Sequence, residues 1–247
     1  MDLIPAIDLL EGRAVRLEQG DFSRPVLDAD PEELAQDWLR RGVRHLHVVD
    51  LAGARDGARS AAGAMARVMT AARAARPDAW IEVAGGLRTL DAVAEAFAAG
   101  ADVVILGTAA LPPSCLVADA AARWPGRIGA ALDLRDGHLA VDGWTRAAAG
   151  DPFTLAPWLV EQGASRLVVT DVRRDGTATG PNLELMARLR GLLPDVRLVA
   201  SGGIGSAADL RALAELGVDG AVVGRALVDG SLAIEEALAA CLAEVRG

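Results

Sequence analysis

An internal repeat constrains the fold of this chain more than any other feature of its sequence. Thr89 and Ser206 are candidate helix N-caps, and each is followed at the same interval by a Gly placed to end the helix, Gly100 or Gly217. A pair of consecutive Gly residues precedes each cap, and the next apolar segment ends in a Gly at equal distances from the two pairs. Because a spacing that recurs along a chain indicates a duplicated architecture, we expect two superposable halves.

Eight short apolar segments, each followed by a segment with helical periodicity, are distributed along the chain. They lack polar alternation, which is typical of parallel strands covered on both faces. Eight such units in 247 residues match a (β/α)8 barrel, and no Gly/Ser/Pro-rich linker divides the chain. We therefore predict the α/β class and a single (β/α)8 TIM barrel over 1–247, built from two repeated (β/α)4 halves at roughly 1–125 and 126–247. The predicted strands are Ile4–Asp8, His45–Asp50, Trp80–Gly85, Asp102–Gly107, Ile128–Leu134, Arg166–Asp171, Val196–Ser201 and Gly220–Gly224.

Two acids, Asp8 and Asp133, end the first and the fifth predicted strands. Asp8 alone would be read most simply as a cap or turn residue. If the halves superpose, however, the two acids face each other across the barrel mouth, where catalytic groups of such barrels lie. Facing carboxylates suit general acid and general base catalysis. Thr170 and Asp171 end the sixth strand; we expect an auxiliary hydroxyl and a possible alternative acid, with capping of the next loop as the simpler interpretation.

The Gly pairs and strand-end glycines predict phosphate binding. Backbone N–H groups beside Gly can approach a phosphate closely, and the helix that follows directs its positive end toward it. The glycines could instead only form tight turns, but those after strands seven and eight occupy the usual phosphate position of these barrels. The repeat supplies a second copy, so we expect a substrate phosphorylated at both ends. The predicted residues are Gly202, Gly203, Gly224 and Arg225 in the second half and Gly85, Gly86, Gly107 and Thr108 in the first.

Other candidate residues give weaker signals. Trp144, in the loop after strand five, is either a hydrophobic plug or a stacking surface for a planar ligand. His45 and His47 lie on one face of a strand, but no third ligand is spaced to join them, so we expect a structural role and no metal site. The sequence contains no Ser/His/Asp set, Walker loop or metal-ligand cluster. It therefore predicts catalysis without a cofactor.

Charge and cysteine content exclude several classes of protein. A net charge of −9 argues against a broad basic surface for nucleic acid. Cys115 and Cys241 form no cluster and suit a reducing compartment. No charge-free stretch of about 20 apolar residues is present, and residues 1–20 lack the pattern of a signal peptide. We expect a cytoplasmic protein without membrane or nucleic-acid partners, and the short loops favour a monomer.

Motifs at the strand ends resemble, in order and nearly end to end, one family. They are IPAIDLLEGRAVRLEQGDF, HVVDLAGA, GGLR, LGTAA, ALDLRDG, VDGW, VVTDVRRDGTATGPN, ASGGIGS and VVGRAL. The family is that of the phosphoribosylformimino-aminoimidazole carboxamide ribotide isomerases of histidine biosynthesis. The resemblance implies an Amadori rearrangement of a doubly phosphorylated aminoaldose into an aminoketose. It also implies that Asp8 is the proton acceptor, Asp133 the proton donor and Thr170 an aid to ring opening. The imine formed on ring opening would be the electron sink, which explains why no cofactor is needed.

The chain departs from the family motifs on the first-half side of the predicted substrate. Ala52 stands where the family usually has Asp, Ser60 lies where an Asn is usual, and Ala84 precedes the Gly pair where the family often has a third Gly. These departures concern individual substrate contacts and leave the acid pair intact.

Three alternatives to the isomerase differ from it in particular residues. The cyclase of imidazole glycerol phosphate synthase shares the repeat but typically carries a Lys in the segment where this chain has Arg16, a predicted substrate-binding residue. Bifunctional relatives, which also isomerise phosphoribosylanthranilate, typically have an Arg shortly before the loop Trp; here Asp142-Gly143 precede Trp144, also predicted to bind substrate. A non-catalytic sugar-phosphate-binding protein would keep the glycines and lose the acids, yet both acids are present.

Overall fold

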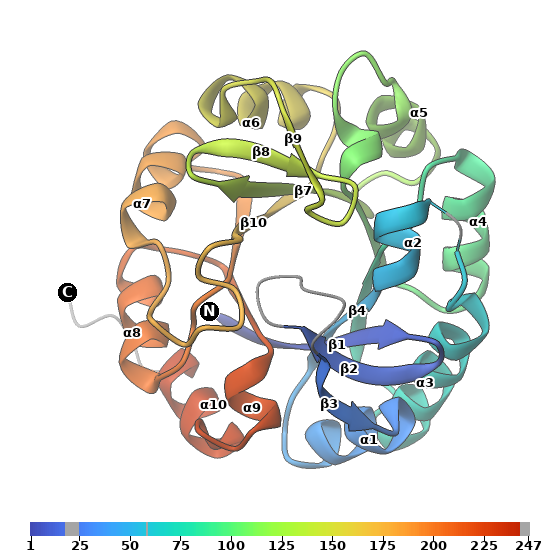
Figure 1. Ribbon diagram of the computed structural model, residues 1–247, viewed down its shortest axis with the longest axis vertical. Helices are drawn as coiled ribbons and strands as arrows, with labels where there is room; N and C mark the ends of the chain where they lie inside the picture. The colour runs from blue at the N-terminus through green and yellow to red at the C-terminus, as the bar shows by residue number, and fades with distance from the viewer. Residues whose placement is uncertain (18–24, 58, 243–247) are drawn as a thin grey trace.

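Eight parallel strands close into a barrel, seen along its axis in Figure 1. The computed structural model describes residues 1–17, 25–57 and 59–242. Closure is made where β12 pairs with β1, with Asp2 beside Gly220. The prediction of a (β/α)8 barrel is confirmed, and each predicted strand is present to within two residues at either end. The barrel strands are β1 (Asp2–Leu10), β4 (His45–Asp50), β5 (Trp80–Ala84), β6 (Val103–Leu106), β7 (Ile128–Arg135), β10 (Arg166–Asp171), β11 (Arg197–Ser201) and β12 (Gly220–Val223).

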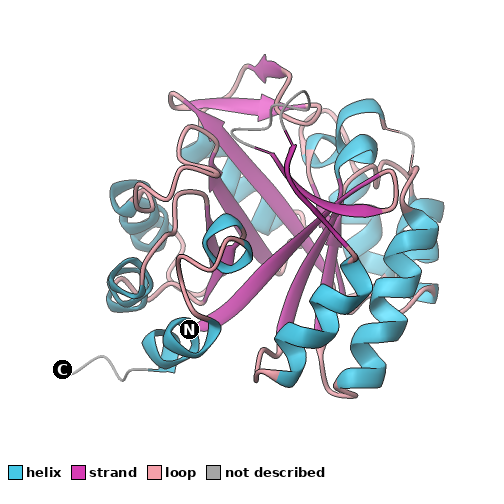
Figure 2. Ribbon diagram, turned by 60° about the horizontal axis from the view of Figure 1, so that its bottom comes forward, coloured by secondary structure: helices cyan, strands magenta, loops and turns pink. Residues whose placement is uncertain are grey.

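Helices surround the barrel and bury one face each against the strands (Figures 1 and 2). Of the helices described, none combines the length and the apolar composition needed to cross a membrane. The helices are α1 (Pro31–Arg40), α2 (Leu51–Asp56), α3 (Ala62–Ala75), α4 (Leu90–Ala98), the 3-10 helix η1 (Thr108–Ala110), α5 (Leu116–Arg123), α6 (Pro152–Glu161), α7 (Leu183–Leu192), α8 (Ala207–Glu215), α9 (Arg225–Val228) and α10 (Ile234–Leu242).

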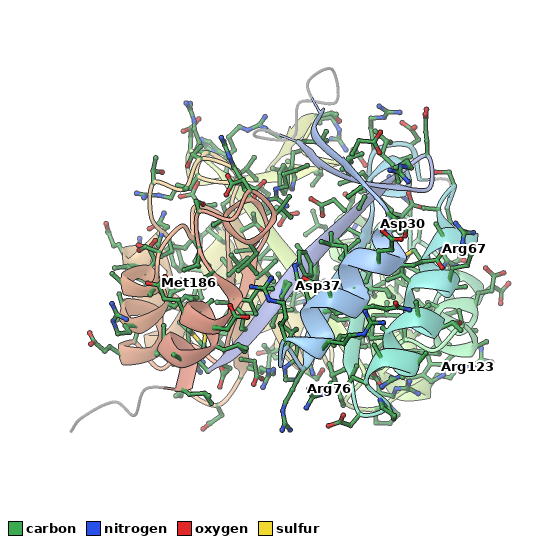
Figure 3. The ribbon with its side chains drawn as sticks, turned by 90° about the horizontal axis from the view of Figure 1, so that it is seen from below. Asp30, Asp37, Arg67, Arg76, Arg123 and Met186 are labelled. Atoms are coloured by element: carbon green, nitrogen blue, oxygen red, sulfur yellow. The ribbon has the colours of Figure 1, made fainter. Side chains whose placement is uncertain are left out.

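Helix starts follow the local sequence. The carboxylate of Asp30 accepts hydrogen bonds from the backbone N–H groups of Glu32 and Glu33, with Pro31 in the first turn. Figure 3 shows Asp30 at the start of α1 and Arg67 on the neighbouring α3, where the guanidinium pairs with Glu32 at 2.7 Å. Short-range capping of this kind explains why helix starts can be predicted from sequence.

The predicted caps at Thr89 and Ser206 are both present, and α8 begins with a full capping box. The Ser206 hydroxyl accepts from the Asp209 backbone N–H at 3.2 Å, and the Asp209 carboxylate accepts from the Ser206 backbone N–H at 2.9 Å. We expect Ser206→Ala to lower the free energy of unfolding by about 1 kcal/mol in urea denaturation. The control is Thr70→Ala, which removes a mid-helix hydroxyl from α3 and should be close to neutral. Equal stability of the two variants would contradict the role of the cap.

The two halves repeat each other in backbone packing. A Cβ atom added to Gly85 would lie 2.1 Å from the carbonyl oxygen of Asp50, and one added to Gly202 would lie 2.5 Å from the carbonyl oxygen of Asp171. Gly85 and Gly202 both have positive φ, at 93° and 92°. A side chain is therefore excluded at each position for two reasons: the positive φ would strain a residue with a side chain, and a Cβ atom would clash with the backbone. These equivalent turns agree with the predicted pair of (β/α)4 halves.

Two antiparallel hairpins project beyond the barrel strands and were not predicted as strands. β2 (Arg13–Leu17) pairs with β1 and β3 (Pro25–Ala29), while β8 (His138–Val141) pairs with β7 and β9 (Arg146–Ala148). Both connecting turns, Glu11-Gly12 and Asp136-Gly137, have positive φ at each residue, the geometry that joins two strands tightly. Figure 1 shows the hairpins on opposite sides of the ring, and Figure 2 shows strands extending past one end of the barrel. They bring side chains over the mouth.

Candidate active site

A pocket opens at the carboxyl ends of the barrel strands. Its floor and walls include Asp8 from β1, His47 from β4, Asp133 from β7 and Thr170 from β10. The predicted acids Asp8 and Asp133 therefore share one cavity, together with Thr170. Strand register explains this placement, because inward-facing side chains alternate along each strand. Asp8, Asp133 and Thr170 face inward near the carboxyl ends of their strands, whereas His47 lies one inward position before Val49, which also lines the pocket.

Arg16 joins two carboxylates in this pocket. From β2 its Nη1–H donates to Asp8 Oδ2 at 2.7 Å, and its Nη2–H donates to Asp175 Oδ1 at 2.8 Å. All three side chains are largely buried. A Cβ atom on Gly224 would lie 2.4 Å from Arg16 Nη1, so the absence of a side chain at Gly224 makes room for the guanidinium. The hairpin thus supplies a cation that fixes the orientation of two acids.

The opposite wall is built around Asp133. The indole Nε1–H of Trp144 donates to Asp133 Oδ2 at 2.9 Å. The side chain of Thr170 also hydrogen-bonds the carboxyl group, and β7 and β10 place the two residues side by side in register. Trp144 lies in the loop after β8 with φ of 67°. Its indole is therefore a polar contact to an acid as well as a wall of the pocket.

Burial determines the protonation behaviour of two acids. Removal from water raises the pKa of Asp133, and the hydrogen bonds from Trp144 and Thr170, which favour the carboxylate, offset it only in part. Burial likewise raises the pKa of Asp175; the charge of Arg16 opposes the shift and that of Asp8 adds to it. Carboxyl groups that keep a proton to higher pH than usual are suited to act as general acids.

The first-half glycines and Thr108, which the sequence predicted to bind phosphate, lie at the pocket. Gly85, Gly86, Gly107 and Thr108 line the pocket, and Ala84 lies beside them. Their role in phosphate binding stays a prediction. Within the described residues, Ala52 and Ser60 contribute nothing to this lining.

The second-half phosphate residues are only partly at the pocket. Gly224 lines it, whereas Gly202, Gly203 and Arg225 do not contribute among the residues that the structure describes. The Arg225 guanidinium donates to the carbonyl oxygen of Gly176 at 2.6 Å and so holds the loop that carries Asp175.

Asp171 lies outside the described pocket lining. Its carboxylate accepts from the Asn182 side-chain amide at 2.8 Å and from the backbone N–H of Arg173 at 3.1 Å. Its counterpart in the first half, Asp50, accepts from the backbone N–H groups of Gly53 and Ala61. Both acids fasten a loop, which matches the simpler interpretation of Asp171.

Sequence reasoning missed Asp175 and assigned His47 a structural role. Asp175 precedes Gly176 in a loop, and an Asp-Gly pair is most simply read as a turn. The signal in the sequence that could have indicated Asp175 was Arg16, because a guanidinium buried over the barrel needs carboxylate partners. Throughout the described ranges, no three His, Cys, Asp or Glu side chains are grouped to hold a metal ion.

Comparison with known proteins identifies relatives over almost the whole chain. The family model described as "Histidine biosynthesis protein" matches residues 2–233. A protein of Thermomicrobium roseum is 48% identical over 95% of this chain and 95% of its own length. Proteins of Sorangium cellulosum and a Picosynechococcus strain are 45% and 43% identical, covering 98% and 97% of this chain and 100% and 93% of their own lengths. All three are named 1-(5-phosphoribosyl)-5-((5-phosphoribosylamino)methylideneamino)imidazole-4-carboxamide isomerase. The chain belongs to the histidine biosynthesis family, as the motifs at its strand ends predicted.

Proposed function

We propose that the protein is the isomerase of histidine biosynthesis that converts the aminoaldose named in its relatives, here called the formimino carboxamide ribotide, into its phosphoribulosyl form. The observation that carries this is the placement of Asp8 and Asp133 in one pocket, at the ends of β1 and β7. The names of the relatives point to the same reaction. They lend no support to the cyclase or to a silent binding protein.

Ring opening is assigned to Asp133. Its protonated carboxyl group gives a proton to the ribose ring oxygen, the bond from that oxygen to C1 breaks, and the nitrogen lone pair forms a C1=N double bond. Thr170, hydrogen-bonded to Asp133, holds the acid in place. The raised pKa of Asp133 keeps the acid form available at higher pH than for an exposed Asp.

Proton removal from C2 is assigned to Asp8. Arg16 donates to Oδ2 of Asp8, which fixes the carboxylate and leaves the other oxygen to take the proton. The C2–H electrons form a C1=C2 double bond, and the nitrogen recovers its electron pair. The resulting enolamine becomes the ketone when C1 takes a proton and the C2 hydroxyl loses one. No external electron acceptor is required, since the imine accepts the electrons.

Phosphate groups at the two ends of the substrate would hold it across the mouth. The first-half site consists of Gly85, Gly86, Gly107 and Thr108, which line the pocket. The second-half site, beside Gly202 and Gly203, is close in sequence to the start of α8, whose first-turn N–H groups favour anions. Remote binding energy of this kind positions C1 and C2 between the acids.

Steady-state turnover of the purified protein on two substrates tests the proposal. We expect the formimino carboxamide ribotide to be isomerised without added metal or nucleotide, and phosphoribosylanthranilate to be turned over at least about 100-fold less efficiently, a loss of more than 2.7 kcal/mol in transition-state binding. Comparable turnover of both would mean a bifunctional enzyme. Binding of both without turnover would favour the binding protein. The monomeric state and cytoplasmic location stay predictions.

A further inference from the structure

A buried ionic chain lies beneath the acid pair. His47 Nδ1 is 2.7 Å from Glu82 Oε1, and Arg166 Nη1–H donates to Glu82 Oε2 at 3.3 Å. The three residues are 8%, 1% and 7% exposed, for His47, Glu82 and Arg166 respectively. His47 forms part of the pocket floor, whereas Glu82 lies outside its described lining. The three contacting side chains therefore connect the pocket to the barrel interior.

The barrel is built to admit Arg166. A Cβ atom on Gly129 would lie 2.6 Å from Arg166 Cγ and 2.6 Å from Ile105 Cδ1. Gly129 stands beside Ile105 in register within the barrel wall, so its missing side chain leaves the space through which Arg166 passes to reach Glu82. A single larger residue at Gly129 would close this path.

The second half of the barrel shows that the fold does not require these buried ionic contacts. His47 and Glu82 are neighbours in register, three residues before the end of β4 and two before the end of β5. The corresponding neighbours on β10 and β11 are Val168 and Val199, which pack in the apolar barrel core. Burying ionised groups costs free energy that an apolar pair avoids. The ionic chain in one half alone therefore favours a role in the chemistry over a role in stability.

The hydrogen bond to Glu82 decides which ring nitrogen of His47 is available. A neutral imidazole that donates from Nδ1 to a carboxylate presents the lone pair of Nε2. Among the described residues, Glu82 is the hydrogen-bond partner recorded for this ring. A carboxylate that orients an imidazole in this way also stabilises the imidazolium formed when Nε2 takes a proton.

We propose that His47 is a further catalytic residue, whose Nε2 accepts the proton of the substrate C2 hydroxyl as the enolamine becomes the ketone. This inference rests on the proposed function. The O–H bond at C2 breaks, its electrons form the C2=O bond, and the C1=C2 electrons take up at C1 the proton that Asp8 removed from C2. His47 then returns its proton to Asp133, which lost one at ring opening. All three side chains recover their starting forms, without net proton uptake.

The electrostatic surroundings fit this role. Burial by itself lowers the pKa of His47, but the hydrogen bond and the charge of Glu82 outweigh it, and the charges of Asp8 and Asp133 add to the net upward shift. Burial also opposes the charge of Glu82, yet the hydrogen bond from His47 and the charges of His47 and Arg166 lower the pKa of Glu82. A base is most effective when its pKa lies near the working pH, and the shift of His47 is in that direction.

His47→Asn is the primary test, because an Asn amide can still donate to Glu82 but offers no basic nitrogen. We expect kcat to fall by about 10²- to 10⁴-fold, the usual contribution of a general base. His45→Asn, two residues earlier on the same strand and paired loosely with Asp2, is the matched control and should keep wild-type kcat. A kcat for His47→Asn within about threefold of this control would overturn the proposal.

Isotope exchange separates a role in the last step from a role in holding the acids. In D2O, the His47→Asn variant should still exchange the C2 hydrogen of the substrate with solvent, so the ratio of exchange to turnover should rise. With C2-deuterated substrate, the kinetic isotope effect on kcat should approach one, because the step after C2–H cleavage then limits the rate. If exchange and turnover fall together, His47 only supports Asp8 and the proposal fails. Absence of both in the wild-type protein would instead refute the proposed function.

Glu82→Gln supplies a second test should His47→Asn not fold. The Gln oxygen still accepts from Nδ1–H, but the negative charge that raises the pKa of His47 is gone. Because neutral His47 is the active form, the limb of the kcat profile on which activity is lost with falling pH should move to lower pH, and kcat should decrease. A purely structural role predicts an unmoved limb, which would contradict the proposal.

Discussion

Asp8→Asn is expected to reduce kcat by about 10⁴-fold, the upper end of what one general base contributes. Asn is nearly isosteric and still accepts a hydrogen bond from Arg16, which donates to Oδ2 at 2.7 Å in the wild-type protein. It cannot take the C2 proton. Product binding, measured by calorimetry, should therefore change far less than kcat, because the variant removes an interaction needed only in the transition state.

The control for this variant is Asp28→Asn. Asp28 lies on β3, where its exposed carboxylate accepts from Arg13 at 2.6 Å, away from the pocket lining. Loss of an exposed pair has little effect on stability, so kcat and unfolding should match the wild type. Turnover of Asp8→Asn within about tenfold of this control would remove Asp8 from the mechanism.

Asp133→Asn is expected to lower kcat by about 10³-fold and to abolish the limb of the pH profile on which activity falls as pH rises. The acid must be protonated to open the ring, so activity is lost as pH passes upward through its pKa. Burial raises that pKa, and the limb should lie above the range of an exposed Asp. Trp144→Phe removes a hydrogen bond that favours the carboxylate, and should move the limb to still higher pH.

Asp175 provides the discriminating control for this prediction. Its pKa is also raised by burial, and it shares Arg16 with Asp8. If Asp175→Asn abolishes the high-pH limb while Asp133→Asn keeps it, the proton donor is Asp175 and the assignment to Asp133 is wrong. If Asp175→Asn retains the limb with reduced kcat, Asp175 is a positioning residue that holds Arg16.

Periodicity and turn chemistry were enough to predict the architecture from sequence. Apolar segments without alternation specified the parallel strands, and local residues such as Asp30, Thr89 and Ser206 specified where helices begin, because a cap bonds within its own first turn. The hairpins beyond β1 and β7 were missed because their added strands are short. The first strand of each hairpin is the end of a barrel strand and not a separate apolar segment.

The site could be predicted only where it follows from strand ends. Asp8 and Asp133 could be paired from the sequence, because the repeat fixes equivalent strands and parallel strands end at one face. The glycines of the second half show the limit of this reasoning. Gly202 and Gly203 follow the repeat, yet within the described residues only the first-half pair lines the pocket.

The sequence alone determined the barrel, its two halves, its helix caps and the position of its acid pair, since each depends on neighbours along the chain or on the repeat. Only the tertiary structure decided which distant charges meet. Arg16 and Asp175 are separated by 159 positions, and Glu82 and Arg166 by 84. The hairpin geometry that carries Arg16 over the mouth, and the empty space at Gly129 through which Arg166 reaches Glu82, arise when the barrel closes. Sequence spacing does not encode where a long side chain ends, and the partner of a buried charge is therefore decided by packing.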